Sequence, residues 1–203
     1  ATESGDVQDS ITILDADPAP TLSIDDVTAA ETSGNATFSI TLSAPSSLPI
    51  SVDFASTDGS ALAGQDYVAV SGTRVFAPGE TVAQVVVPVT ADGVDEPDET
   101  FVVDLSAPLN AVIGDGQGVG TITDANAAPT VTLSLLDSVL VEEGGSTQLV
   151  ATLSAVSAQD VTVTLAWSGT AVLGTDYSAG LQIVIPAGSL SGALTITTID
   201  DSA

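Results

Sequence analysis

Residues 37–54 read TFSITLSAPSSLPISVDF and contain two runs in which apolar and polar residues alternate. Alternation with a period of two is typical of a β-strand that buries one face. Alanine, proline and serine separate the runs at residues 44–47, and such residues favour a turn. The stretch therefore predicts a strand, a turn and a second strand. The apolar residues of the two runs are Phe38, Ile40 and Leu42, then Ile50, Val52 and Phe54.

The same pattern extends over the rest of the chain. Val161, Val163 and Leu165 alternate in the same way, and turn-forming clusters recur at residues 57–60 and 77–80. No window combines helical periodicity with helix caps. Many short strands separated by turns predict an all-β antiparallel sandwich or barrel with almost no helix.

An internal repeat sets the domain organisation. Residues 64–67 (GQDY) return at 174–177 (GTDY), and residues 21–23 (TLS) return at 132–134. A third copy begins the chain, because residues 11–20 (ITILDADPAP) match 120–129 (GTITDANAAP) without a gap. The repeat is about 110 residues long, which is the size of one domain.

This phasing divides the chain into three parts. Residues 1–17 are expected to be the terminal strand of a preceding module, residues 18–128 a complete module, and residues 129–203 a second module that lacks its last two strands. Unpaired sheet edges promote aggregation unless they are covered. We therefore expect the natural polypeptide to continue, or a neighbour to supply strands.

Charge excludes several partners. The sequence has 27 Asp plus Glu against 1 Lys plus Arg, with no His, for a formal net charge of -26. Such a polyanion repels phosphate backbones and anionic lipid, so we expect no nucleic-acid partner. No segment approaches the roughly 20 apolar residues of a membrane-spanning helix, so we expect no direct membrane insertion. The acidic excess either keeps chains apart in solution or binds divalent cations.

Residues that catalysis commonly uses are missing. Without Cys or His, the chain has no disulfide, no zinc site of the usual kind and no imidazole to activate Ser or Thr. Its paired carboxylates recur once per repeat, as an active site seldom does. We therefore expect no enzyme activity.

Acidic residues cluster at predicted strand ends. The densest run, residues 92–99 (DGVDEPDE), has five carboxylates in eight residues. Such crowded charges repel, and a bound cation offsets the repulsion. Calcium fits best, because it accepts several oxygens in irregular geometry, although a solvated acidic turn is the plain alternative.

The residues resemble a known family, the Calx-beta domain, here in tandem and of the bacterial extracellular repeat type. The similarity rests on residues 58–67 (DGSALAGQDY), 75–81 (VFAPGET), 92–101 and 121–124 (TITD). It implies tandem immunoglobulin-like antiparallel β-sandwiches, which hold Ca²⁺ in loops at one end of the module.

The resemblance also implies the metal ligands. In the complete module, Ala91, Ala125 and Asn126 stand where the family often has carboxylates, which implies one or two ions rather than a larger cluster. Asp95 and Asp98 are expected to face solvent. The implied ligands of the complete module are Glu31, Asp66, Asp92, Glu96, Glu99 and Asp124; those of the second module are Glu142, Asp176, Asp200 and Asp201; and Asp15 and Asp17 close the preceding module.

Together these features predict a calcium-binding structural or adhesive repeat of a secreted or cell-surface protein, in which calcium rigidifies module tips and boundaries. Its expected partners are calcium and the neighbouring modules of the same chain or fibre. Two alternatives stay open. The chain could be a spacer or ligand-binding accessory module of a larger secreted enzyme, with Trp167 as a candidate carbohydrate contact. It could also be a subunit of a filament, a homopolymer completed by strand donation.

Overall fold

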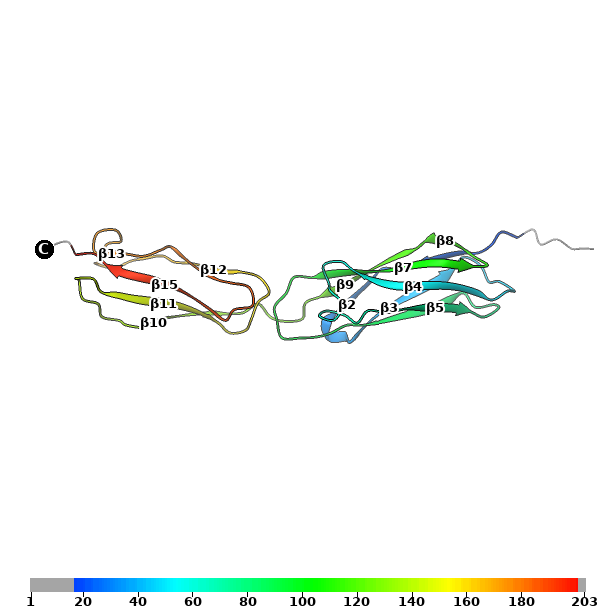
Figure 1. The fold of residues 1–203 in the computed structure, drawn as a ribbon, viewed down its shortest axis with the longest axis horizontal. Helices are drawn as coiled ribbons and strands as arrows, with labels where there is room; N and C mark the ends of the chain where they lie inside the picture. The colour runs from blue at the N-terminus through cyan, green and yellow to red at the C-terminus, as the bar shows by residue number, and fades with distance from the viewer. Residues whose placement is uncertain (1–16, 201–203) are drawn as a thin grey trace, which may run out of the picture.

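The computed structural model describes residues 17–200, which form two β-sandwich modules placed end to end (Figure 1). We call strands β1 to β9 the first module and strands β10 to β15 the second module. The described residues contain no α-helix, only a 3-10 turn at Glu31–Ser33. The predicted all-β fold of tandem sandwiches is confirmed. No helix in residues 17–200 has the length and apolar character needed to span a membrane.

The first module consists of a four-stranded and a five-stranded sheet. In the first sheet the order is β6-β3-β1-β8, and in the second it is β2-β9-β7-β4-β5. Neighbouring strands are antiparallel except for two parallel pairs, β1 with β8 and β2 with β9. The strands are β1 (Thr21–Ile24), β2 (Val27–Ala30), β3 (Asn35–Leu42), β4 (Ile50–Asp58), β5 (Ser71–Phe76), β6 (Val82–Pro88), β7 (Glu99–Leu109), β8 (Val112–Asp115) and β9 (Gln117–Thr123).

The core of the first module is built from the alternating residues of both sheets, as the sequence pattern predicts. Phe101 lies at its centre, stacked on Tyr67 with ring centroids 4.5 Å apart and edge-on to Phe38 at 5.9 Å. The buried Tyr67 hydroxyl donates a hydrogen bond to Asp58 Oδ1 at 2.6 Å. Gly120 faces the Phe101 ring, and a Cβ there would come within 2.5 Å of it. Aromatic packing and this close approach fix how the sheets meet.

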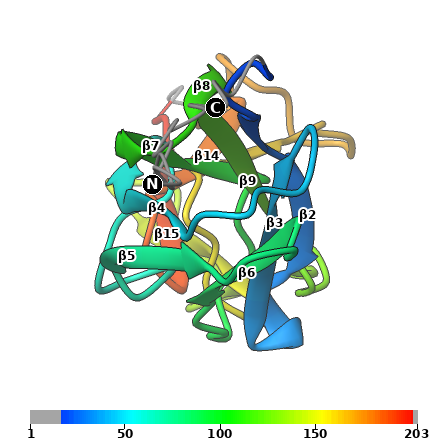
Figure 2. The ribbon, with the colours of Figure 1, turned by 90° about the vertical axis from the view of Figure 1, so that its right-hand side faces the viewer.

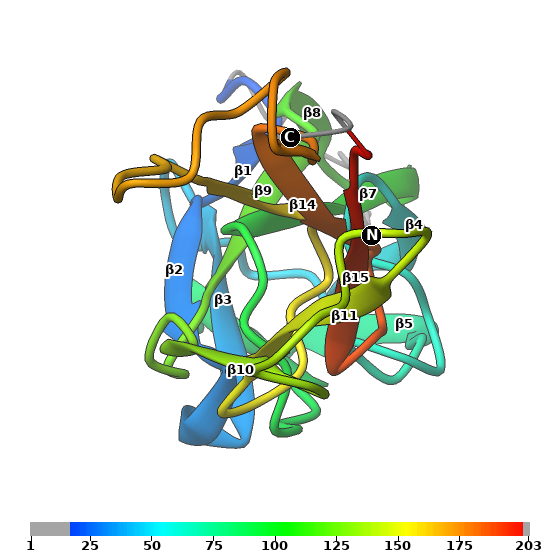
Figure 3. The ribbon, with the colours of Figure 1, turned by 90° about the vertical axis from the view of Figure 1, so that its left-hand side faces the viewer.

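The second module repeats part of this arrangement. One sheet has the order β10-β11-β15-β13, and the other contains β12 and β14. Figures 2 and 3 view the ribbon along its long axis, from the first and from the second module respectively. The strands are β10 (Val131–Leu135), β11 (Ser146–Leu153), β12 (Val161–Thr164), β13 (Tyr177–Ser178), β14 (Gln182–Ile185) and β15 (Ser191–Thr198).

Strand pairing differs between the modules at one edge. In the first module β4 pairs with both β5 and β7, whereas within residues 17–200 its counterpart β12 pairs only with β14. The second core is correspondingly smaller, and Leu133 and Val139 are 50% and 85% exposed. Trp167 packs against this core, edge-on to Tyr177, and its Nε1 donates to the Gly180 carbonyl at 3.0 Å.

Hydrogen bonds at the start of each module correct one detail of the repeat alignment. Thr21 and Ser43 are joined by two hydrogen bonds of 2.9 Å. The Thr21 amide donates to Ser43 Oγ, and the Ser43 amide donates to the Thr21 carbonyl. Thr130 makes the same two bonds, also at 2.9 Å, with Ser154. Thr130 is therefore the counterpart of Thr21, and the match of residues 21–23 with 132–134 is wrong. The second module has two more residues between these partners, which a three-residue sequence match cannot locate.

Candidate metal centre

Six acidic side chains meet at the end of the first module. They come from the 3-10 turn after β2, the turn before Tyr67, the loop between β6 and β7, the start of β7 and the residue after β9. Parallel pairing explains part of this meeting, because Ala30 of β2 is aligned with Thr123 of β9. The next acidic residues along each strand must then lie side by side. The six residues line one small cavity and are Glu31, Asp66, Asp92, Glu96, Glu99 and Asp124.

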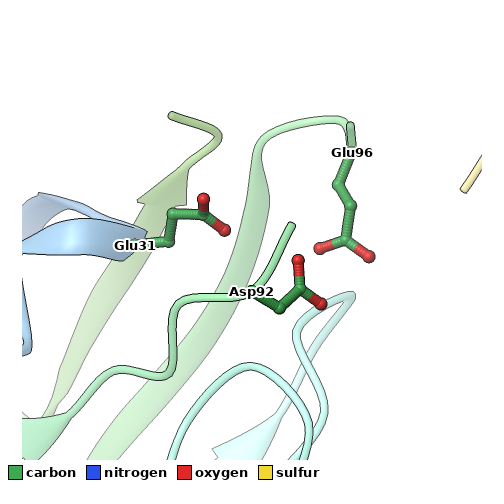
Figure 4. Close-up of side chains that lie close together, drawn as sticks. All are labelled: Glu31, Asp92 and Glu96. Atoms are coloured by element: carbon green, nitrogen blue, oxygen red, sulfur yellow. The ribbon is translucent and has the colours of Figure 1, made fainter. Parts of the chain in front are cut away.

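The carboxylates form two adjoining triads. Oxygens of Glu31, Asp92 and Glu96 lie within 4.8 Å of one another, and so do oxygens of Asp66, Glu96 and Glu99. Figure 4 shows the first triad, in which the carboxylates of Asp92 and Glu96 point toward each other. Calcium binds oxygens at about 2.3–2.6 Å, so two ligands of one ion lie at most about 5 Å apart. Each triad therefore has the spacing of a single cation site, with Glu96 shared between them.

Crowding raises the proton affinity of the glutamates. Burial is the largest cause at Glu96, whose pKa is raised further by the charges of Asp92, Asp66, Glu31 and Asp124. Burial, then the Asp66 charge and the hydrogen bond with Asp66, raise the pKa of Glu99 from 4.5 to about 7. Burial and the charges of Asp124 and Asp92 also raise the pKa of Glu31. A bound cation would relieve this repulsion.

Local backbone bonds hold the aspartates in place. Asp66 Oδ2 accepts from the Leu62 amide at 2.6 Å, and Asp92 Oδ1 accepts from the Val94 amide at 2.8 Å. Asp124 Oδ1 accepts from the Asn126 amide at 2.9 Å. Each aspartate thus uses one carboxylate oxygen to accept a backbone amide of its own loop. The cavity between them measures about 10 Å³, close to the space that one water needs.

Asn126, which the sequence predicts only as a position where a carboxylate is missing, makes hydrogen bonds within the cluster. Its side-chain Nδ2 donates to Glu31 Oε1 at 2.7 Å and to the Val94 carbonyl at 2.9 Å. An amide nitrogen cannot ligate a cation, and here it occupies one oxygen of Glu31. The structure therefore gives a physical reason for fewer ions than a fully acidic cluster would hold.

The remaining predicted ligands are not gathered into a triad in residues 17–200. Asp176 Oδ2 accepts from the Val172 amide at 2.6 Å, as Asp66 does from Leu62, but no pair of further carboxylates joins it within bridging distance. Glu142 and Asp200 are exposed. Asp17 is exposed at the opposite end of the first module, where it borders a hollow near Pro18. Asp15 and Asp201 lie outside the described residues.

The expectation for Asp95 is wrong, because this residue contacts the second module. Its amide donates to the Val156 carbonyl at 3.2 Å, and its carbonyl accepts from the Ala158 amide at 2.9 Å. Ser157 Oγ donates to Asp95 Oδ2 at 3.0 Å. Asp98, by contrast, is exposed, with Oδ1 accepting from the Asp124 amide at 3.2 Å. The loop that supplies Asp92 and Glu96 to the cluster therefore also forms the boundary between modules.

Comparison with known proteins places these features in context. A family model described as the Calx-beta domain matches residues 15–123 and, a second time, residues 124–203. Sodium/calcium exchanger 2 of Rattus norvegicus is 46% identical over 68 residues, which are 34% of this chain and 7% of the exchanger. Sodium/calcium exchanger 1 of Bos taurus is 36% identical over 92 residues, which are 42% of this chain and 10% of the exchanger. The chain thus corresponds to a small part of these relatives.

Solved structures show the same architecture. The crystal structure of the apo-form Calx CBD1 domain is 26% identical with a TM-score of 0.50, and the match covers 53% of this chain and 98% of that domain. The calcium binding domain CBD12 of CALX1.1 matches both modules with a TM-score of 0.51 at 21% identity, covering 86% of this chain and 74% of the other. The second match concerns the fold alone.

Proposed function

The chain belongs to the Calx-beta family, and from this premise we propose that its first module binds one or two calcium ions in the six-carboxylate cluster. Bound calcium then orders the loop from Asp92 to Glu99 and, through Asp95, holds the second module in a fixed direction. The observation that carries the proposal is the pair of carboxylate triads sharing Glu96, each with cation spacing. Similarity to sodium/calcium exchangers adds support.

Calcium suits the donor set better than other common cations. The side-chain ligands of the cluster are carboxylate oxygens brought together from several loops, which a hard cation with six to eight oxygens and flexible geometry accepts. Magnesium requires a near-octahedral arrangement, and zinc prefers nitrogen and sulfur ligands. Binding in the folded state alone stabilises that state by mass action, by about 2.7 kcal/mol at a free calcium concentration 100 times Kd.

In the full-length protein we place these modules in an extracellular or cell-surface array whose role is structural or adhesive rather than enzymatic. The absence of Cys and His in the sequence and the repetition of the acidic positions support this placement. A ligand-binding accessory role is the alternative. The observation that favours it is a hollow of about 450 Å³ lined by Trp167, Tyr177 and Leu181. Trp167, however, already uses its Nε1 for the Gly180 carbonyl and one ring edge for Tyr177.

Isothermal titration and thermal melts test the calcium proposal. In the chain as it stands we expect calcium to raise the melting temperature by about 5–11 °C relative to chelator, given about 2.7 kcal/mol and a shift of about 2–4 °C per kcal/mol for a chain of this size. Replacing Glu96 and Glu99 by Gln should weaken binding by about 100-fold, which is about 2.8 kcal/mol. The matched control is the double variant Asp115→Asn with Asp137→Asn, which removes the same number of charges at exposed positions outside the cluster.

The two variants must behave differently for the proposal to stand. An unchanged melting temperature on chelation would contradict the proposal, and so would equal losses of calcium affinity in the Glu96 and Glu99 variant and in the control with Asp115→Asn and Asp137→Asn. Equal losses would mean that the net charge of the chain, rather than the cluster, attracts the ion.

A further inference from the structure

Two loops in different modules have the same internal hydrogen bonds. In the second module, Ser157 Oγ accepts from the Gln159 amide at 3.2 Å, and the Ser157 carbonyl accepts from the Gly188 amide at 2.9 Å. In the first module, Ser46 Oγ accepts from the Leu48 amide at 3.0 Å, and the Ser46 carbonyl accepts from the Gly79 amide at 2.9 Å. We call residues 155–159 the Ser157 loop and residues 44–48 the Ser46 loop. Each loop follows the second β-strand of its own β1–β3 or β10–β11 pair.

The Ser157 loop is occupied by the acidic loop of the first module. Asp95 inserts as a parallel β-bridge partner of Ser157, and the bridge is closed by the Val156 carbonyl and the Ala158 amide. The Ser157 hydroxyl then donates to the Asp95 carboxylate, and Ser157 is only 2% exposed. A module boundary is thus built from two backbone bonds and one charge-assisted side-chain bond.

The Ser46 loop offers the same three groups, and within residues 17–200 they make no hydrogen bond to an acidic loop. The Pro45 carbonyl corresponds to that of Val156 and the Ser47 amide to that of Ala158, and neither is bonded to a described residue. Pro45 has no amide hydrogen to donate, but the counterpart residue Val156 contributes only its carbonyl to the boundary, so proline is compatible with the same contact. Leu48 beside them is 57% exposed. This end of the first module therefore carries the same arrangement of hydrogen-bonding groups as the Ser157 loop.

Space for an occupant is present as well. A hollow of about 690 Å³ lies between the Ser46 loop and the segment Asp17–Pro20. At the boundary of the two modules the corresponding position is taken by Val94 and Asp95, and Asn126 of the linker donates to the Val94 carbonyl. The hollow thus matches the place that an acidic loop fills one repeat later.

The length of the linker before the first module is suited to placing the acidic loop of a preceding module at the Ser46 loop. Residues 15–20 and 124–129 align without a gap, and Thr21 and Thr130 are anchored to Ser43 and Ser154 by the same pair of bonds. A module joined ahead of Asp15 would therefore be held from the first module by a linker of the same length as the one that joins the two modules here.

We propose that the Ser46 loop is a docking site for the acidic loop of a preceding Calx-beta module, whose aspartate at the Asp95 position pairs with Ser46 as Asp95 pairs with Ser157. The array then repeats one boundary from module to module and behaves as a rod of fixed pitch. This proposal rests on hydrogen bonds and linker length and does not depend on calcium binding.

Cysteine crosslinking tests it, because the chain contains no Cys. Residues 18–123 are placed ahead of residue 15 of the chain, in place of residues 1–14, to give three modules. The added copy carries Asp95→Cys and the original first module carries Ser46→Cys. The positive control is Asp95→Cys with Ser157→Cys in the chain as it stands, and the negative control replaces Asp95→Cys of the added copy by Asp104→Cys on β7.

Intramolecular crosslinking of position 95 with position 46, at the rate of the positive control and well above the negative control, is the expected result. Crosslinking of only the positive control would overturn the proposal, as would crosslinked dimers of the three-module chain in place of the intramolecular product. A second measurement needs no substitution. Hydrogen exchange of the Ser47 amide should slow in the three-module chain to the rate of the Ala158 amide, and an unchanged rate would also overturn the proposal.

Discussion

Asn126 is the residue that most directly limits the charge of the metal centre. It aligns with Asp17 in the repeat, and its amide nitrogen binds Glu31 Oε1 at 2.7 Å where a carboxylate would repel it. This one bond supplies part of the compensation that a cation would otherwise provide. Residue identity at this position therefore helps to set the net charge of the cluster.

Replacing Asn126 by Asp should increase calcium dependence. The new carboxylate lies beside Glu31, so the chelated protein should melt at a lower temperature, while calcium should bind about tenfold more tightly or with one more ion per chain; tenfold is about 1.4 kcal/mol. Calorimetric titration gives affinity and stoichiometry together. Gln84→Glu, an exposed position on β6, adds the same charge away from the cluster and should change neither. Unaltered binding by N126D would show that Asn126 lies outside the coordination sphere.

The raised glutamate pKa values predict a pH dependence of stability in chelator. Glu99 binds its proton more tightly in the folded chain, with a pKa of about 7 against 4.5, so its protonation favours folding. This contribution is present below pH 4.5 and is lost as pH rises through about 7. The melting temperature of the chelated protein should therefore fall over this range, and Glu99→Gln should flatten the fall. A melting temperature that rises across the same range in chelator would contradict the prediction.

At the scale of elements, the loop between β6 and β7 has two faces. Asp92 and Glu96 line the carboxylate cavity, whereas Asp95 between them bonds to the Ser157 loop of the second module. Neighbouring residues of one short loop thus line the carboxylate cavity and contact the next module. Any ordering of this loop by calcium acts on the boundary without a longer path.

Removing the Asp95 side chain should loosen the boundary and leave the metal site intact. Asp95→Ala loses the bond from Ser157 Oγ, a charge-assisted hydrogen bond of the kind that contributes about 1.5–3 kcal/mol. Nitrogen relaxation should then report more independent tumbling of the two modules, and calcium should restrict that tumbling less than it does in the wild type. Asp95→Asn keeps an oxygen acceptor and should restore most of the coupling. Equal tumbling in wild type and Asp95→Ala would show that the backbone bonds alone hold the boundary.

At the scale of the whole molecule, the net charge of -26 opposes compact folding throughout both modules. Within residues 17–200, the carboxylate triads with cation spacing are confined to one end of the first module. Several other acidic residues are stabilised by single hydrogen bonds, as Asp25 is by accepting the Ser39 amide at 2.6 Å and Asp58 by accepting the Tyr67 hydroxyl at 2.6 Å.

Salt should therefore stabilise the chelated chain. Raising ionic strength from about 0.01 M to about 1 M shortens the screening length from about 30 Å to about 3 Å, so repulsion between modules and within the cluster is reduced. The melting temperature in chelator should rise with sodium chloride, and the rise should be smaller when calcium is bound. A fall with salt in both conditions would mean that self-repulsion is not what limits stability.

Strand periodicity and repeat phase are local in the chain, and they were enough to predict the all-β fold and the size of the repeat. The six acidic residues that line the cavity were implied by the resemblance of the sequence to Calx-beta domains. The sequence could not determine that Asp95 turns away from its acidic neighbours or that Asn126 caps Glu31. Both depend on contacts between segments that are 62 and 95 residues apart. It also misplaced the counterpart of Thr21, which only the bonds of Thr130 with Ser154 located. Composition and spacing specify which groups are available; the packing of sheet ends and of one module on the next decides which of them meet, because that packing is set by the summed burial of both cores rather than by any local pattern.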